Sequence, residues 1–214
     1  METYQQISIP LLLITIIGIA LTYVVRPGKE SWKHPLHAAV HIFTLAFIEQ
    51  KLSFAGAIRK LVYMLALLSF IILAITGFYP TLVKGEHISG YLLMIHATFA
   101  PILAICLAVL AVMWAGNSKF KSSDWLWFSR LLEKITLTKA NENSTAEKSM
   151  LVQKTGFWLT IVLALPLILS MVLSMLPYFG TYWQELFLFI HRYTALIFTI
   201  AVIIHTHIII RAQM

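Results

Sequence analysis

The sequence is poor in charge, and poorest in acidic charge. Only 12% of its 214 residues are charged, with 9 Asp and Glu against 16 Lys and Arg. The long apolar stretches contain no Asp, and only Glu185 borders one of them. A buried charge needs compensation, so this scarcity disfavours an ion carrier. The lack of HExxH, a Gly-rich phosphate loop and paired carboxylates disfavours an independent hydrolase or transferase.

Cysteine is also nearly absent. Cys106 is the only one, and it lies inside an apolar stretch. The chain therefore has no intrachain disulfide, no CxxCH site for covalent haem attachment and no cysteine-ligated iron-sulfur cluster. Any metal cofactor must be held mainly by histidine, of which there are 8.

What the chain has in abundance is apolar sequence, since 59% of its residues are hydrophobic. Five stretches are long enough to cross a hydrocarbon layer about 30 Å thick. Open strand edges are not tolerated in lipid, so all five are predicted to be helices. The sequence therefore predicts an all-α, multi-pass membrane protein in the lipid bilayer. The stretches are residues 7–25, 61–79, 91–114, 156–176 and 186–210.

We divide the chain into an N-terminal membrane helix (1–26), a histidine-containing segment (27–60) and a four-helix membrane domain (61–214) with a long loop at 115–155. The first helix has no basic residues before it, so we interpret it as retained rather than as a cleaved signal. Two interfacial helices are also predicted, around "WKHPLHAAVHIFTLAFIEQKLS" and "WLWFSRLLEKI".

The basic residues predict the orientation. Six of the 16 Lys and Arg lie between the first and second stretches, and seven lie between the third and fourth. By the positive-inside rule both segments are cytoplasmic, which puts the N-terminus outside and the C-terminus inside. The net charge of +7 then reflects topology and anionic lipid, and no nucleic-acid partner is expected.

The last apolar stretch carries His191, His205 and His207. On an ideal helix His191 and His205 differ by about 40° around the axis and about 21 Å along it. They share one face at two depths, whereas His207 points elsewhere. This arrangement fits two stacked haems, each taking one axial imidazole from the same helix.

Each such haem needs a second histidine at a matching depth. His96 lies about five residues inside the outer end of its helix, as His191 does, so these two are the predicted ligands of an outer haem b. The inner partner of His205 is sought in His37 or His41, with His41, the deeper one, preferred. An intramembrane histidine can instead be an interhelical hydrogen-bond donor or part of a proton path.

Other polar residues near these positions have two interpretations each. Arg192, at the outer boundary, would pair with a haem propionate or extend toward the headgroups. His87 and His207 are interpreted as structural or as neighbours of a quinone site. The predicted metal ligands are His96, His191, His205 and His41.

Three motifs follow one another along the chain: "IRKLVYMLALLSFIILAITGFYP", "YLLMIHATFAP" and "IHRYTALIFTIAVIIH". Over residues 59–211 this order resembles the di-haem cytochrome b subunits that anchor periplasmic respiratory oxidoreductases, the formate dehydrogenase gamma and Ni-hydrogenase cytochrome b class.

In that class the first helix also carries a haem ligand, fourteen residues before its glycine. Here that position is Tyr63. Either the inner haem is lost, or a histidine among His34, His37 and His41 replaces the ligand, or Tyr63 borders a quinone pocket.

The resemblance implies a b-type cytochrome subunit with one or two haem b, in the bacterial inner membrane. It would pass electrons between membrane quinone and a periplasmic cytochrome c or iron-sulfur protein, within a hetero-oligomeric complex. "Enzyme" would apply only to that complex. A ferric-reductase-like domain is a weaker hypothesis, because such a domain uses two helices that each carry a pair of histidines, and only one helix here carries a pair. The alternative of another class is a haem-free transporter or assembly factor that uses its histidines as a proton or metal path.

Overall fold

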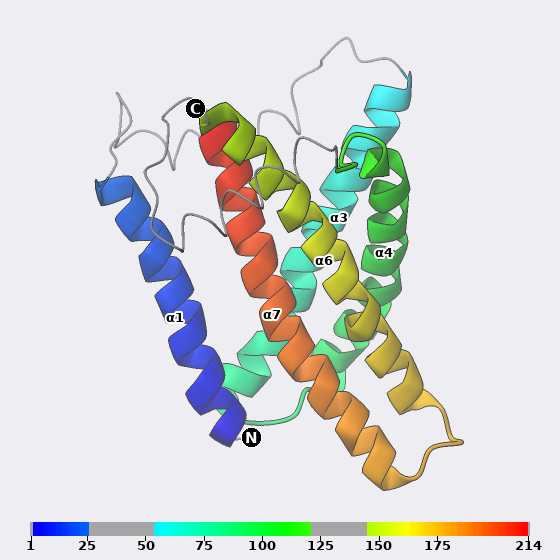
Figure 1. Cartoon of the computed structure of the whole chain (residues 1–214). Helices are drawn as coiled ribbons and strands as arrows, with labels where there is room; N and C mark the ends of the chain where they lie inside the picture. The colour runs from blue at the N-terminus through cyan, green and yellow to red at the C-terminus, as the bar shows by residue number, and fades with distance from the viewer. Residues whose placement is uncertain (1, 26–53, 121–144, 214) are drawn as a thin grey trace.

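The computed structural model of the protein describes residues 2–25, 54–120 and 145–213, which form a helical bundle (Figure 1). Each of its five long helices is long and apolar enough to cross a membrane. The prediction of an all-α, multi-pass membrane protein is therefore confirmed. The elements are α1 (Glu2–Val25), α3 (Phe54–Phe78), the short π-helix η1 (Tyr79–Lys84), α4 (Gly90–Ala115), α6 (Thr145–Met175) and α7 (Thr181–Gln213).

Several helices extend beyond the apolar stretches that predicted them. α6 begins at Thr145 rather than near residue 156, and α7 at Thr181 rather than near residue 186. The added part of α6 is rich in Ala, Glu, Lys and Gln, which are strong helix formers, so the helix continues past its apolar part. The predicted loop 115–155 is therefore helical in its last part.

Some predictions fall outside the described residues. They are the interfacial helix with its histidines His34, His37 and His41, and the interfacial helix around "WLWFSRLLEKI". These stay predictions.

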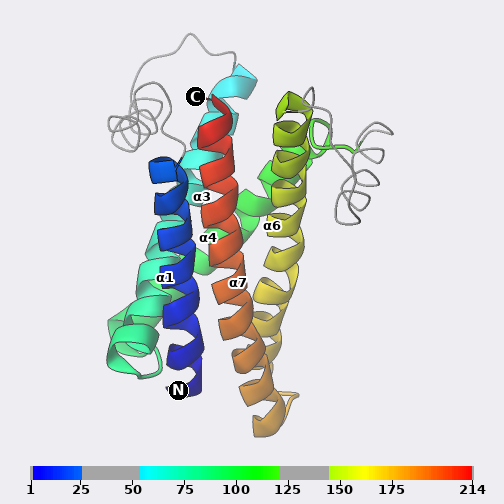
Figure 2. The ribbon, with the colours of Figure 1, turned by 60° about the vertical axis from the view of Figure 1, so that its left-hand side comes forward.

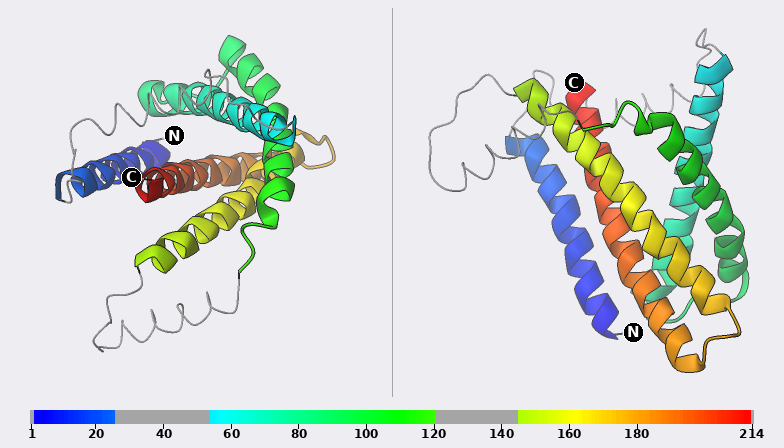
Figure 3. Two further views of the ribbon diagram at one scale, coloured as in Figure 1. Left: turned by 90° about the horizontal axis from the view of Figure 1, so that it is seen from above. Right: turned by 45° about the vertical axis from the view of Figure 1, so that its right-hand side comes forward.

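The long helices form two antiparallel hairpins, α3 with α4 and α6 with α7. Seen along the bundle, α7 is central, with α1, α3 and α6 around it and α4 on the side away from α1 (Figure 3). The turned view in Figure 2 shows α1 beside α7. Contacts are extensive within each hairpin, whereas α4 and α6 touch at few points. Residues on α4 and α7 can therefore face one another across the seam between the hairpins.

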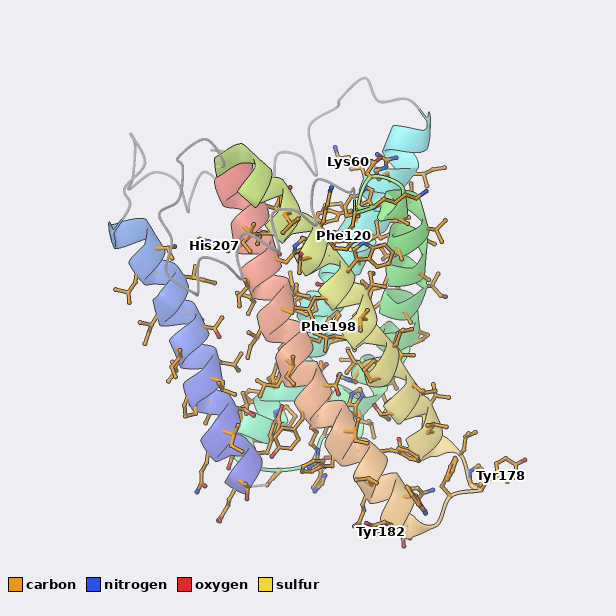
Figure 4. The ribbon with its side chains drawn as sticks, in the orientation of Figure 1. Lys60, Phe120, Tyr178, Tyr182, Phe198 and His207 are labelled. Carbon is orange, nitrogen blue, oxygen red and sulfur yellow. The ribbon has the colours of Figure 1, made fainter. Side chains whose placement is uncertain are left out.

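The two ends of the bundle carry different connections. The N-terminus, η1 and the 176–180 turn lie at one end, which we call the short-loop end, and the C-terminus lies at the other, the C-terminal end (Figure 1). Tyr178 and Tyr182 mark the short-loop end, and Lys60 and Phe120 lie toward the C-terminal end (Figure 4). The short-loop end corresponds to the end predicted to be outside.

Packing between the hairpins centres on the middle of α7. Leu196 and Phe198 are 1% and 3% exposed, and the Phe198 ring lies 6.0 Å from that of Phe70 on α3. Phe198 is near mid-height of the bundle (Figure 4). Within the first hairpin, α3 and α4 bury a separate cluster of Ala66, Leu103, Cys106 and Leu110.

α1 is held by polar contacts near both of its ends. At the short-loop end the Tyr4 hydroxyl donates to the Arg192 carbonyl at 3.3 Å, and the Gln5 amide donates to the Leu82 carbonyl at 3.2 Å. Much of the remaining surface of α1 is exposed aliphatic side chain, as expected for a helix that faces lipid.

At the C-terminal end α1 is held by the Thr22 hydroxyl, which lies 3.1 Å from Nε2 of His207 on α7. The Thr22 hydroxyl proton is donated to the Ile19 carbonyl at 2.7 Å, so its oxygen accepts the proton on His207 Nε2. His207 lies on the α1 side of α7 in Figure 4. This bond matches the structural interpretation of His207.

We expect Thr22→Val to weaken the docking of α1, because it removes an interhelical acceptor and keeps the side-chain shape. Such bonds in membranes contribute about 0.6 kcal/mol on average and up to about 1.7 kcal/mol. The control is Thr15→Val, since Thr15 bonds to the Leu11 carbonyl of its own helix. Thermal unfolding of the purified protein in detergent measures both variants. Equal midpoints would contradict a docking role for Thr22.

Candidate functional site

His96 of α4 and His191 of α7 meet across the seam between the two hairpins. Their ring centroids are 6.4 Å apart and their planes are inclined by 77°. His96 lies six residues after the start of α4 at Gly90, and His191 lies ten residues after the start of α7 at Thr181. Both positions are toward the short-loop end. The two histidines predicted to share one depth are thus close together, although α7 begins earlier than expected.

The ring proton of His191 is fixed by the backbone. Its Nδ1 lies 2.9 Å from the Leu167 carbonyl oxygen of α6. A carbonyl oxygen only accepts, so Nδ1 carries the proton. Nε2 of the neutral ring then has a free lone pair, which is the form that binds a metal.

The ring proton of His96 is fixed by a side chain. Its Nδ1 lies 2.9 Å from the Thr76 hydroxyl of α3. Thr76 donates its own proton to the Ile72 carbonyl at 2.7 Å, so the hydroxyl oxygen accepts from His96 Nδ1. His96 therefore has the same tautomer as His191, with the Nε2 lone pair free.

The ring spacing fits a shared metal. Imidazole nitrogens bind metals at about 2.0–2.1 Å, and each lies about 1.1 Å from its ring centre, so rings on opposite sides of one metal have centres about 6.3 Å apart. The observed separation is 6.4 Å. With both Nε2 lone pairs free and the rings close together, His96 and His191 have the donor atoms that would hold a haem b.

His205 lies further along α7 against α6. A Cβ added at Gly156 would lie 3.1 Å from His205 Cγ and still closer to its Nδ1, so the ring packs directly on the glycine backbone. That Nδ1 is buried and has no hydrogen-bond partner among the described residues. A buried polar atom without a partner is costly, so His205 differs from His96 and His191, whose Nδ1 atoms are both bonded.

Tyr63 belongs to an aromatic cluster toward the C-terminal end. Its ring lies 6.2 Å from that of Trp114 on α4, and Trp114 lies 6.4 Å from Phe157 on α6. Phe157 directly follows Gly156, which packs on His205. The structure thus brings Tyr63 into the same region of the bundle as His205, but no direct contact between the two is among the described interactions.

Arg192 and His87 meet at the short-loop end. The Arg192 guanidinium donates to Nδ1 of His87 at 2.8 Å. This pairing ties the loop before α4 to α7, beside His191. Pairing of Arg192 with a haem propionate stays a prediction.

Four residues that sequence reasoning did not assign to the site contact its histidines: Thr76, Gly77, Gly156 and Leu167. A Cβ on Gly77 would lie 3.2 Å from His96 Cε1, so a larger residue there would press on the ring. The available signal was a glycine inside an otherwise apolar helix, which commonly marks close packing.

A model of the prokaryotic cytochrome b561 family matches residues 58–214. The chain belongs to this family. No curated protein and no solved structure gave a significant match.

Family membership confirms the resemblance to the Ni-hydrogenase type of cytochrome b. The chain is therefore a membrane b-type cytochrome, an electron-transport protein of a family that binds haem b. This sets aside the haem-free transporter or assembly factor. The match begins after α1, so the N-terminal helix is an addition to the matched cytochrome b561 region.

We expect Gly156→Ala to destabilise this cytochrome, because the added methyl group overlaps the His205 ring. Forcing extra atoms into a packed site typically costs about 1–3 kcal/mol. Gly18→Ala is the control, since a Cβ at this helical glycine meets no atom within 4 Å. Thermal unfolding should show a loss for the first and no loss for the second. Similar midpoints would mean that Gly156 does not seat His205.

Proposed function

We propose that this cytochrome is the membrane subunit of a quinone-linked respiratory oxidoreductase, with His96 and His191 as the axial ligands of one haem b. The observation that carries the proposal is the pair of rings 6.4 Å apart, each with its proton held at Nδ1. A half-buried pair of neutral imidazoles suits a low-spin haem b better than a proton path, which would require proton exchange at both ring nitrogens.

In this proposal the protein holds the haem and orients the two imidazoles that bind it. Thr76 and the Leu167 carbonyl fix both tautomers, and Gly77 lets His96 lie against α3. When bound, haem b supplies the one-electron chemistry, which no side chain here can provide. Arg192, beside His191, is proposed to pair with a haem propionate.

The C-terminal end is proposed to exchange electrons with quinone. His205 of α7 is proposed to bind a second haem b at that end. The other ligand of this haem is proposed to be His41 or, failing that, His37. The aromatic cluster of Tyr63, Trp114 and Phe157 supports a quinone pocket at the same end, because flat apolar rings suit a quinone head group.

The short-loop end is proposed to face a periplasmic cytochrome c or iron-sulfur protein in a bacterial inner membrane. The connections there, residues 85–89 and 176–180, are too short for a catalytic domain, so a partner must supply one. The basic residues concentrated in the other two connections support a cytoplasmic C-terminal end.

Ligand substitutions test the outer site. His96→Ala and His191→Ala are each expected to abolish the same haem signal, because a low-spin site needs both axial ligands, while His205→Ala affects only a second signal. His87→Ala is the control, since His87 is exposed and its Nδ1 already accepts from Arg192. Reduced-minus-oxidised spectra of the purified protein measure the outcome. An unchanged spectrum in His191→Ala would overturn the assignment.

Haem content tests the inner site. Two haem b per chain by pyridine haemochrome are expected if His41 or His37 completes the site of His205, and His41→Ala should then reduce the content to one. One haem in the parent protein would instead leave the region of Tyr63 to quinone alone.

Reduction of the haem by a soluble quinol in liposomes tests quinone exchange, and no reduction would contradict it.

A further inference from the structure

Thr76 and Gly77 are consecutive residues of α3 that contact the same imidazole ring. The Thr76 hydroxyl accepts the proton of His96 Nδ1 at 2.9 Å. The Gly77 backbone lies against the same edge of the ring, where an added Cβ would be 3.2 Å from Cε1 and 3.7 Å from Nδ1. Thr76 itself is only 5% exposed, so water does not compete for this bond.

The local sequence ends α3 directly after this pair. Pro80 has no N–H, so it cannot bond to the Thr76 carbonyl as a residue four positions along a helix normally does. α3 ends at Phe78 and the wider η1 turn follows. The Thr81 hydroxyl donates to the Gly77 carbonyl at 2.7 Å and so satisfies a backbone group in this irregular turn.

The two candidate ligands differ in what holds their protons. For His191 the acceptor is a backbone carbonyl, which no substitution removes. For His96 it is a hydroxyl whose own proton is directed to the Ile72 carbonyl. Donation to that carbonyl polarises the hydroxyl and strengthens it as an acceptor. A partner on the second nitrogen of a metal-bound histidine fixes the ring and raises its basicity.

We propose that Thr76, with the space left by Gly77, is the positioning residue that sets the tautomer, orientation and donor strength of His96 and thereby lowers the reduction potential of the haem it binds. The inference rests on the proposed function, since it requires His96 to be a ligand. A more basic imidazole stabilises ferric over ferrous iron because it donates more charge to the metal. Loss of the acceptor should therefore raise the potential.

The test compares Thr76→Val, which keeps the shape and removes the acceptor, with Thr76→Ser, which restores it. The control is Thr98→Val, two residues from His96 on α4, since Thr98 bonds to the Met94 carbonyl of its own helix. Optical redox titration and low-spin electron paramagnetic resonance of the purified cytochrome are the readouts. Thr76→Val should raise the midpoint potential and shift the g-values, while Thr76→Ser and Thr98→Val stay near the parent.

The outcomes separate the two proposals. If Thr76→Val and Thr98→Val give the same potential and g-values while His96→Ala still removes the haem signal, the role of Thr76 is overturned and the ligand assignment stands. If His96→Ala leaves the signal intact, the proposed function itself fails. If Thr76→Val loses haem altogether, the haem content of the other two variants tests the role of Thr76. Haem retained by both Thr76→Ser and Thr98→Val supports the proposal. Loss of haem in Thr76→Ser contradicts it.

Discussion

The structure depends on how an imidazole is kept neutral and oriented inside a membrane. Each ring has one proton, and in lipid that proton must be bonded within the protein. For His191 it goes to the Leu167 carbonyl and for His96 to the Thr76 hydroxyl, so four helices are involved in fixing two rings. The bonds leave both Nε2 atoms free. Each bond lies within one hairpin, so it is the close approach of the two rings that requires the hairpins to keep their relative position.

That requirement gives α7 its central place. It packs along α6, meets α3 through Phe198 and Phe70, and carries α1 on its remaining side. His191 and His205 lie on either side of Phe198, at equal sequence separation. Between these histidines Leu196 and Phe198 are 1% and 3% exposed, so this part of α7 packs closely on its neighbours and holds the two histidines in a fixed relation.

The sequence predicted the fold and the histidine pair for the same physical reason. Lipid length and periodicity place His96 and His191 at one depth, and the structure brings their rings together. It could not predict Thr76 or Gly156 as neighbours, because contacts between α3 and α4 or between α6 and α7 depend on helix rotation and hairpin packing. Helix ends were also missed, since polar residues can continue a helix after the apolar stretch ends.

The contrast between the two histidines of α7 explains why we assign them different roles. His191 has a bonded Nδ1 and a second imidazole opposite it, so it is suited to hold a cofactor in one geometry. His205 has a buried Nδ1 with no partner among the described residues and a ring pressed on Gly156. Under the proposed function, the fixed imidazole of His191 suits electron delivery to a partner, and the end of the bundle that holds His205 is the one proposed to meet quinone.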